Sequence, residues 1–229
     1  MSDIGGTLWK YFEDGGLFMW PLLFLSIISL VVTLERFWVF GRASMKVSRF
    51  VEETQALLQG QGAKEAIENT NRYHGPVASI IKAGLLKHES GGGREQIEKT
   101  MENFAIHEVA KLERGLPILA SVANIAPMVG FLGTVAGMVQ SFDVIAEQGL
   151  NDPGAVAKGI SVALLTTAAG LIVALMAQPF FNYFTTRVSA HIRDMETSAN
   201  VLVEIFGNIE ADDDGGPTQV VTAPDANRG

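Results

Sequence analysis

Two apolar stretches of this chain read LPILASVANIAPMVGFLGTVAGMVQSF (residues 116–142) and KGISVALLTTAAGLIVALMAQPFFNYF (residues 158–184). The only charged residue in either stretch is Lys158, at the start of the second. A helix needs about 20 predominantly apolar residues to cross a bilayer. Each stretch therefore predicts a membrane-spanning helix, and the polar residues 143–157 between them predict the loop that joins the two.

A third apolar stretch, LFMWPLLFLSIISLVVTLERFWVF, occupies residues 17–40 and predicts another span. Its only charged residues, Glu35 and Arg36, lie near the far end, beside two aromatic residues. Charged and aromatic side chains at the end of a spanning helix reach the lipid headgroups. The sequence therefore predicts three spans.

The charges that flank the spans predict their orientation, because cytoplasmic flanks are rich in Lys and Arg. Residues 1–16 hold one lysine against three acids, whereas residues 36–49 hold four basic residues. The expected loop 143–157 holds three acids and no basic residue, and Arg187 and Arg193 follow the third span. We therefore expect an all-α membrane protein whose N-terminus lies outside and whose C-terminus lies in the cytoplasm.

The segments outside the spans have helical patterns of their own. Apolar residues at helical spacing in residues 1–16 predict a periplasmic amphipathic segment at the membrane interface, and a loosely ordered tail is the alternative. Residues 41–115 predict a cytoplasmic helical domain, whose last helix, starting at Arg94, runs toward the second span. Residues 185–210 predict a cytoplasmic continuation of the third span. Residues 211–229 are acidic and rich in Pro and Gly, which is typical of a disordered tail.

Composition argues against several classes of function. The chain has no cysteine and a net charge of -8, so thiolate sites and a basic nucleic-acid-binding face are not expected. Its four histidines are scattered without metal-ligand spacing, and the three glycines at 91–93 lack the GK[ST] continuation of a phosphate loop. We therefore expect no enzymatic activity, no resident metal, no cofactor and no nucleic-acid partner.

Small residues recur along both central spans. In a membrane such residues let helix backbones approach closely. The expected packing residues are Gly130, Gly133 and Gly137 in the second span and Gly159, Ala163 and Gly170 in the third. Pro127 lies within the second span and predicts a kink, because it leaves one backbone carbonyl without its helical partner.

Hydroxyl groups accompany these small residues. Thr134 and Thr167 lie near the middle of their spans, and Thr166 and Ser161 lie beside them. Threonine in a spanning helix often only bonds its own helix. Together, however, these hydroxyls could line a narrow hydrated path and transiently hold a sodium ion at Thr134 and Thr167. The core of each span lacks a titratable residue, so a group that takes up protons would have to come from a partner.

The sequence of the spans resembles the MotA/TolQ/ExbB family of ion-driven inner-membrane motors. The resemblance rests on GGLFMWPLLFLSIISLVVTLERFW (15–38), IAPMVGFLGTVAGMVQSF (125–142) and GISVALLTTAAGLIVAL (159–175). The arrangement of spans is similar to the three-span ExbB and TolQ subunits rather than to the four-span flagellar stator subunit.

The resemblance implies a homopentamer around a central pore, in a lipid bilayer that is the inner membrane of a Gram-negative bacterium. Within the pentamer would lie a single-span partner like ExbD or TolR with an intramembrane aspartate. A TonB-like or TolA-like protein would receive the mechanical work. The pore threonines of the family fall on Thr134 and Thr167. The pore glutamate of ExbB and TolQ falls on Val162, and VALLTT (162–167) is instead similar to sodium-driven stators, so the ion is a proton or sodium.

We therefore expect an ion-channel or stator subunit that couples an ion gradient to mechanical work, such as TonB-dependent transport. The alternative is a non-conducting membrane scaffold whose small-residue faces serve oligomerisation only. The sequence leaves open which process the motor powers, which partner it uses and what the cytoplasmic domain 41–115 does.

Overall fold

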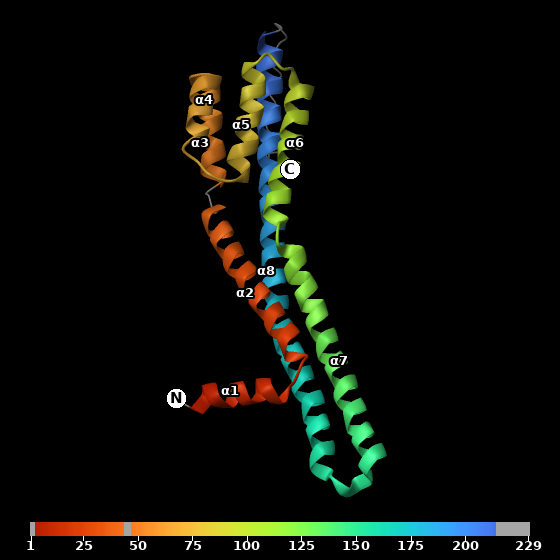
Figure 1. The fold of residues 1–229 in the computed structure, drawn as a ribbon. Coiled ribbons are helices and arrows are strands. Elements are labelled where there is room, and N and C mark those ends of the chain that lie inside the picture. Colours follow the sequence, from red (N-terminus) through yellow and green to blue (C-terminus); the bar gives the residue numbers. More distant parts are fainter. Residues whose placement is uncertain (1–2, 44–46, 214–229) are drawn as a thin grey trace, which may run out of the picture. The chain divides into compact units, whose positions relative to one another are not determined.

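The computed structural model describes residues 3–43 and 47–213, and every regular element in these residues is a helix (Figure 1). The described residues form two compact units. The first unit holds α1, α2, α7, η1 and α8 as far as Val188, and the second holds α3 to α6 and the rest of α8. Helical runs within Met19–Gly41, Arg94–Gln148 and Pro153–Gly207 are long and apolar enough to cross a membrane. The expectation of an all-helical protein is confirmed, and it has three candidate spans.

In the first unit, a sharp turn joins α1 (Asp3–Asp14) to α2 (Met19–Ala43). Gly16 makes this turn with a φ of 70°, a backbone conformation that glycine adopts without steric penalty. Figure 1 shows α1 lying across the axis of α2. The N-terminal segment is therefore a helix in the structure rather than a loosely ordered tail.

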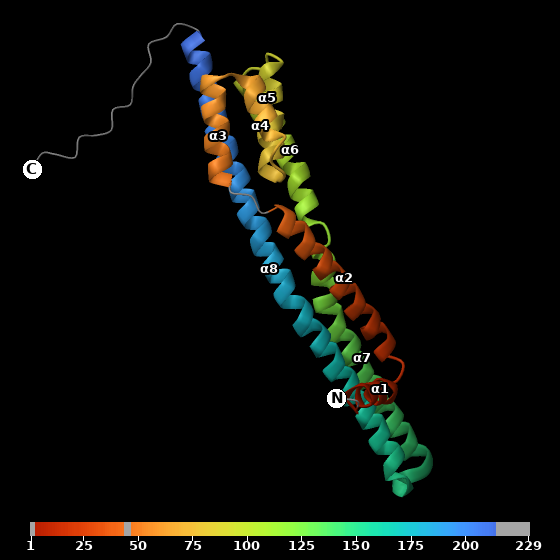
Figure 2. The ribbon, with the colours of Figure 1, turned by 90° about the vertical axis from the view of Figure 1, so that its left-hand side faces the viewer.

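Helices α7 (Leu116–Gln148) and α8 (Pro153–Asp213) lie side by side as an antiparallel hairpin in the first unit (Figures 1 and 2). They are longer than the sequence suggested. We expected a loop over residues 143–157, but the connection consists only of η1 (Gly149–Asn151) and Asp152. Asp152 accepts a hydrogen bond from the Ala155 amide at 3.0 Å and so caps α8.

Helix α2 packs on both helices of the hairpin. Leu25 and Ile28 of α2 contact a buried cluster made of Val122, Ala123 and Ala177. Nearer the end of α2, Phe40 stacks on Phe184 with a ring-centroid distance of 5.5 Å. These contacts make a three-helix bundle of the three spans.

The second unit consists of short helices packed on the C-terminal part of α8. Its helices are α3 (Val47–Gly60), α4 (Ala63–Thr70), α5 (Pro76–Glu89) and α6 (Arg94–Glu113). The ring of His88 stacks on that of Phe206 with their centroids 4.4 Å apart. The C-terminal helix therefore completes the core of the domain that we expected from residues 41–115 alone.

Helix α6 does not run on into α7, because the backbone turns at Gly115 between the two helices. Its φ of 89° lies in the left-handed region. Helix α8 continues to Asp213, three residues into the expected tail. The remainder of that expected tail, residues 214–229, lies outside the described residues.

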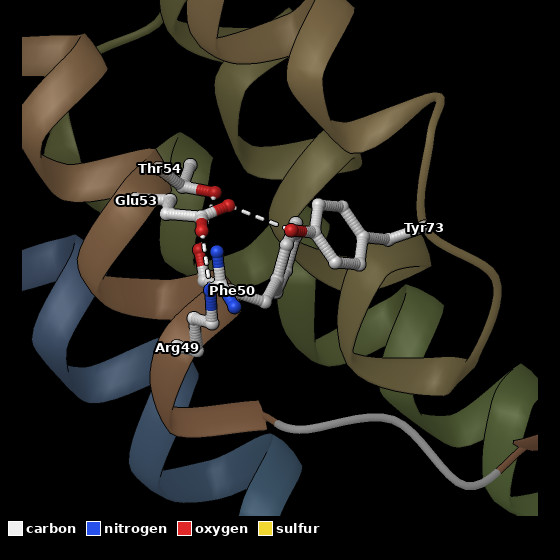
Figure 3. Close-up of polar contacts among 5 residues, drawn as sticks. All are labelled: Arg49, Phe50, Glu53, Thr54 and Tyr73. Atoms are coloured by element: carbon white, nitrogen blue, oxygen red, sulfur yellow. Dashed lines mark hydrogen bonds and ion pairs between the residues drawn. The ribbon is translucent and has the colours of Figure 1, made fainter.

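A polar cluster ties the connection after α4 to α3. Figure 3 shows Glu53 between Arg49 and Tyr73. The Tyr73 hydroxyl donates to Glu53 at 2.6 Å, and Arg49 Nε donates to the other carboxylate oxygen at 2.8 Å. The bond from Tyr73, followed by that from Arg49, lowers the pKa of Glu53, and the same bond raises the pKa of Tyr73. This cluster fixes residues on either side of α4.

Candidate functional site

The backbones of α7 and α8 touch along a seam of small residues. A methyl group placed on Gly137 would lie 2.5 Å from the carbonyl oxygen of Gly159, and one on Gly170 would lie 2.6 Å from that of Ala126. Ordinary van der Waals contact begins at about 3.4 Å, so these positions have no room for a side chain. The seam contains all the small residues that we expected to pack, namely Gly130, Gly133, Gly137, Gly159, Ala163 and Gly170.

Thr166 is fully buried in this seam, with no exposed surface. It fills the space opposite Gly133, where an added methyl group would lie 2.5 Å from Thr166 Cβ. Its hydroxyl lies 2.9 Å from the carbonyl oxygen of Val162 and 3.0 Å from that of Ala163, both in its own helix. Thr166 therefore acts as a packing residue between α7 and α8.

Thr167 lies at the edge of the seam and connects the two helices. Its hydroxyl is 3.1 Å from the carbonyl oxygen of Ala163 in α8 and 3.3 Å from that of Gly130 in α7. One hydroxyl hydrogen serves one acceptor at a time, so three oxygen atoms share one proton. The side chain is only partly buried, so this oxygen cluster is open on one side.

The other expected pathway residues lie apart from this oxygen cluster or face outward. Thr134 is partly exposed and donates to the carbonyl oxygen of Phe131 in its own helix at 2.6 Å. Ser161 is exposed. Val162, where the resemblance placed the family's pore glutamate, is partly buried, and a methyl group on Gly16 would lie 3.9 Å from its Cγ1.

Prolines lie inside both long helices without ending them. Helix α7 continues through Pro127 and α8 continues through Pro179. Pro127 has no N–H, so the carbonyl four residues earlier, that of Ala123, loses its helical donor. Ala123 belongs to the buried cluster on which α2 packs, so this proline lies one turn from the three-helix core.

Two polar contacts of the bundle were not expected from the sequence. Ser141 is buried, and its hydroxyl lies 3.0 Å from the carbonyl oxygen of Val156, across the hairpin. The sequence feature that pointed to this contact is the position of Ser141, four residues after Gly137 in the same row of the helix. Arg36, which we expected to be accessible to the headgroups, is buried in the bundle. It is 2% exposed and pairs with the neighbouring carboxylate of Glu35 at 2.5 and 3.0 Å.

The seam contains hydroxyl and carbonyl oxygens but no acid or base. Neither residues 116–142 nor residues 159–184 include Asp, Glu, His, Lys or Arg. Among the residues that the structure describes, no group of three His, Cys, Asp or Glu side chains could hold a metal ion. The arrangement offers only neutral oxygens, and it has no group of its own that takes up a proton near neutral pH.

Comparison with known proteins places the chain among membrane transport subunits. Residues 72–197 match the MotA/TolQ/ExbB proton channel family. The chain is 30% identical to a biopolymer transport protein ExbB homolog of Methanothermobacter thermautotrophicus, over 97% of the chain and 84% of the relative. It is 32% identical to ExbB-like protein 1 of Synechocystis sp., over 85% of the chain and 76% of the relative. It is 29% identical to biopolymer transport protein ExbB of Pseudomonas putida, over 69% of the chain and 50% of the relative.

Proposed function

This chain belongs to the MotA/TolQ/ExbB proton channel family, and we propose that it is the multi-span subunit of a motor that converts an ion gradient into mechanical work. In this proposal five copies surround a single-span partner like ExbD or TolR, whose intramembrane aspartate takes up the ion. The N-terminus lies in the periplasm and the C-terminus in the cytoplasm of a Gram-negative bacterium. A TonB-like or TolA-like protein receives the work.

The observation that carries the proposal is the open oxygen cluster of Thr167, Ala163 and Gly130. A hydroxyl and two carbonyl oxygens at the edge of a tightly packed helix pair are suitable ligands for a dehydrated cation. Thr134 and Ser161 are accessible enough to extend this path. We leave Thr166 out of the path, because it is fully buried between α7 and α8.

The same residues indicate which ion the motor carries. Since Val162 stands where ExbB and TolQ have a glutamate, this chain lacks a carboxylate of its own along the proposed path. The neutral oxygens favour sodium, whereas a proton would travel by way of the partner's aspartate alone. The two ions therefore differ in how strongly activity depends on Thr167.

The proposal is tested by ion flux into vesicles that contain this chain and its single-span partner, with sodium varied at fixed pH. We expect sodium-dependent flux that Thr167→Ala abolishes and Thr167→Ser retains. Thr186→Ala is the matched control, because Thr186 is exposed and bonds its own helix in the same way, through the carbonyl of Asn182. Flux that follows the pH gradient and ignores sodium would assign the motor to protons.

A non-conducting scaffold is the second candidate. It is favoured by the hydroxyl bonds of Thr134 and Thr166, which all remain within their own helices. The absence of flux under both gradients, in vesicles where the partner is bound, would support the scaffold and contradict the motor.

A further inference from the structure

Two amide side chains lie on exposed surfaces of the second and third spans, well inside the apolar stretches. Gln178 lies nine residues before Arg187, the first charged residue after the third span, and Asn124 lies ten residues after Arg114. At about 1.5 Å per residue these separations are about 14 and 15 Å. Both amides are exposed on the surface of the chain. An amide that meets hydrocarbon without a hydrogen-bonding partner is costly, so a polar group or an ion must cover each of them.

Gln178 lies on the face of α8 that holds Thr167. The two residues are eleven apart, which at about 100° per residue is three full turns and about 20° more. Leu171 lies between them on this face and is 55% exposed. One turn after Gln178, Asn182 accepts a hydrogen bond at its amide oxygen from Gln178 Nε2, at 3.1 Å. We call these four residues, Thr167, Leu171, Gln178 and Asn182, the Thr167 row; it leads from the open edge of the seam toward the end of the span.

The hydrogen bonds of the two amides use their nitrogen atoms. Asn124 Nδ2 donates to the carbonyl oxygen of Ala120 in its own helix at 2.9 Å, and Gln178 Nε2 donates to Asn182. The amide oxygens of Asn124 and Gln178 are therefore the acceptors that these side chains offer to their surroundings. An amide oxygen is a suitable ligand for a hard cation, but it does not take up a proton near neutral pH.

Pro179 adds a backbone oxygen close to Gln178. Helix α8 continues through Pro179, which has no N–H, so the carbonyl of Leu175 loses its helical donor. Leu175 is 73% exposed and lies three residues before Gln178. In a membrane, a carbonyl that a proline frees is satisfied by neighbouring polar groups or by ordered water. A side-chain oxygen and a backbone oxygen therefore lie within one turn of α8.

The amide of α7 lies near the same level as that of α8. Ala123 and Ala177 belong to one buried cluster, and Asn124 and Gln178 are the residues that follow them. The two helices therefore bring an exposed amide each to one part of the bundle.

The nearest basic residue of α8 points away from the Thr167 row. Arg187 follows Gln178 by nine residues, which is about 180° around the helix. Its guanidinium lies 5.4 Å from the ring centre of Tyr183. A cation that moves along the row therefore does not meet this positive charge directly.

We propose that the amide oxygens of Gln178 and Asn124, together with the freed carbonyl oxygen of Leu175, form a second site for a partly hydrated alkali cation. The inference rests on the proposed function, because it makes the Thr167 row part of the ion path. A cation that leaves Thr167 reaches this amide site about 16 Å further along α8, at about 1.5 Å per residue, before it leaves the C-terminal end of the span. All three ligands are neutral, so the amide site holds the cation weakly and releases it.

The test uses single cysteines, because the native chain contains none. Leu171→Cys places a thiol in the Thr167 row, and Met176→Cys places one five residues nearer the C-terminal end of the span, about 140° away around α8. Both replaced side chains are exposed, at 55% and 61%. The probe is the silver ion, a monovalent cation that reacts with thiols. Silver nitrate is added to vesicles that contain the chain and its single-span partner, oriented with the C-terminal end of α8 outward, and a maleimide then labels the thiols that remain in the denatured chain.

We expect silver to react with Leu171→Cys about tenfold faster than with Met176→Cys, or more, because a path lined by oxygens raises the local concentration of cations. Position along the helix alone predicts the opposite, since Met176 lies nearer the outer solution. Sodium nitrate should slow the reaction of Leu171→Cys, and N-methylglucamine nitrate at the same ionic strength should not. Gln178→Leu, combined with Leu171→Cys, should also slow it, whereas Gln178→Asn, which keeps an amide, should not.

Equal rates at Leu171→Cys and Met176→Cys would overturn the proposal, because the Thr167 row would then face lipid or another helix. A rate at Leu171→Cys that ignores sodium would also overturn it, because the row would then be wet without holding a cation. Separation of the assembly into single chains by Gln178→Leu, seen by size-exclusion chromatography, would show that the amide binds a neighbouring chain instead.

The silver measurement uses no ion gradient and no turnover, so its failure differs from failure of the motor. Sodium-sensitive labelling of Leu171→Cys in vesicles that show no flux would support the amide site and contradict the motor. Sodium-dependent flux in vesicles where labelling ignores sodium would contradict the amide site alone.

Discussion

Substitution of Gly170 by alanine tests whether close backbone contact between α7 and α8 holds the bundle together. Gly170 lies near the middle of the seam, and an added methyl group would be 2.6 Å from the carbonyl oxygen of Ala126 and 3.1 Å from Cα of Gly130. Both neighbours are backbone atoms, so no side-chain rotation relieves the overlap. The helices must therefore move apart.

The size of the effect follows from the overlap. Contact at about 3.4 Å in place of 2.6 Å requires a separation of about 0.8 Å. A gap of about 0.5–1 Å forfeits a quarter to a half of the dispersion energy of each contact. Helix association in lipid depends on such packing, because no hydrophobic effect drives it. Overpacking of this kind reduces stability by about 1–3 kcal/mol, or about 2–12 °C in Tm for a chain of this size.

Alanine also favours a helix more than glycine does, so a control must remove that effect. Gly41→Ala is the matched control, because Gly41 lies in α2 and has no atom within 4 Å of the added methyl group. The difference in Tm between the two variants, measured by thermal unfolding of the purified protein in detergent, isolates the overlap. If Gly170→Ala proved as stable as Gly41→Ala, the backbone contact in the seam would not be the source of stability.

Three further substitutions probe other contacts. Gly115→Ala places a side chain at a φ of 89°, and it should lower stability by about 1–2 kcal/mol in thermal unfolding; an unchanged Tm would contradict the need for glycine. Ser141→Ala removes the bond to Val156 and should reduce stability by about 1 kcal/mol, whereas Ser141→Thr, which keeps the hydroxyl, tests whether the bond or the space matters. Tyr73→Phe should raise the pKa of Glu53 toward its ordinary value in an NMR titration. Because the pKa of Glu53 is lowered in the folded chain, its bond stabilises at neutral pH and is lost as the pH falls through that lowered value; an unchanged pKa in the variant would show that Tyr73 is not the cause.

Much of the fold could be predicted because membrane spans leave a strong signal in one sequence. Long apolar stretches with few or no charges indicated the three candidate spans, and the spacing of small residues indicated the residues of the seam. Both signals arise from local requirements, since lipid excludes charge and close backbone contact excludes side chains. Neither requirement depends on knowing the partner helix.

The ends of the long helices could not be predicted in this way. The second apolar stretch ends at residue 142, yet α7 continues as a helix to Gln148. The helix beyond the apolar stretch is accompanied by contacts across the hairpin, such as the bond from Ser141 to Val156. Those contacts join residues far apart in sequence, so no pattern within one helix reveals them. The same holds for Arg36, which is buried next to the turn at Gly115.

The distinction between Thr166 and Thr167 shows why a helical face alone does not identify a site. Successive residues point about 100° apart around a helix, so both threonines border the same row of small residues. Only the antiparallel register with α7 decides between them: Gly133 lies opposite Thr166, and the carbonyl of Gly130 lies within reach of Thr167. The register thus places one hydroxyl in the packed seam and the other at its open edge. If the seam sets these roles, Thr166→Ala should lower the Tm of the purified protein, whereas Thr167→Ser should change neither stability nor flux.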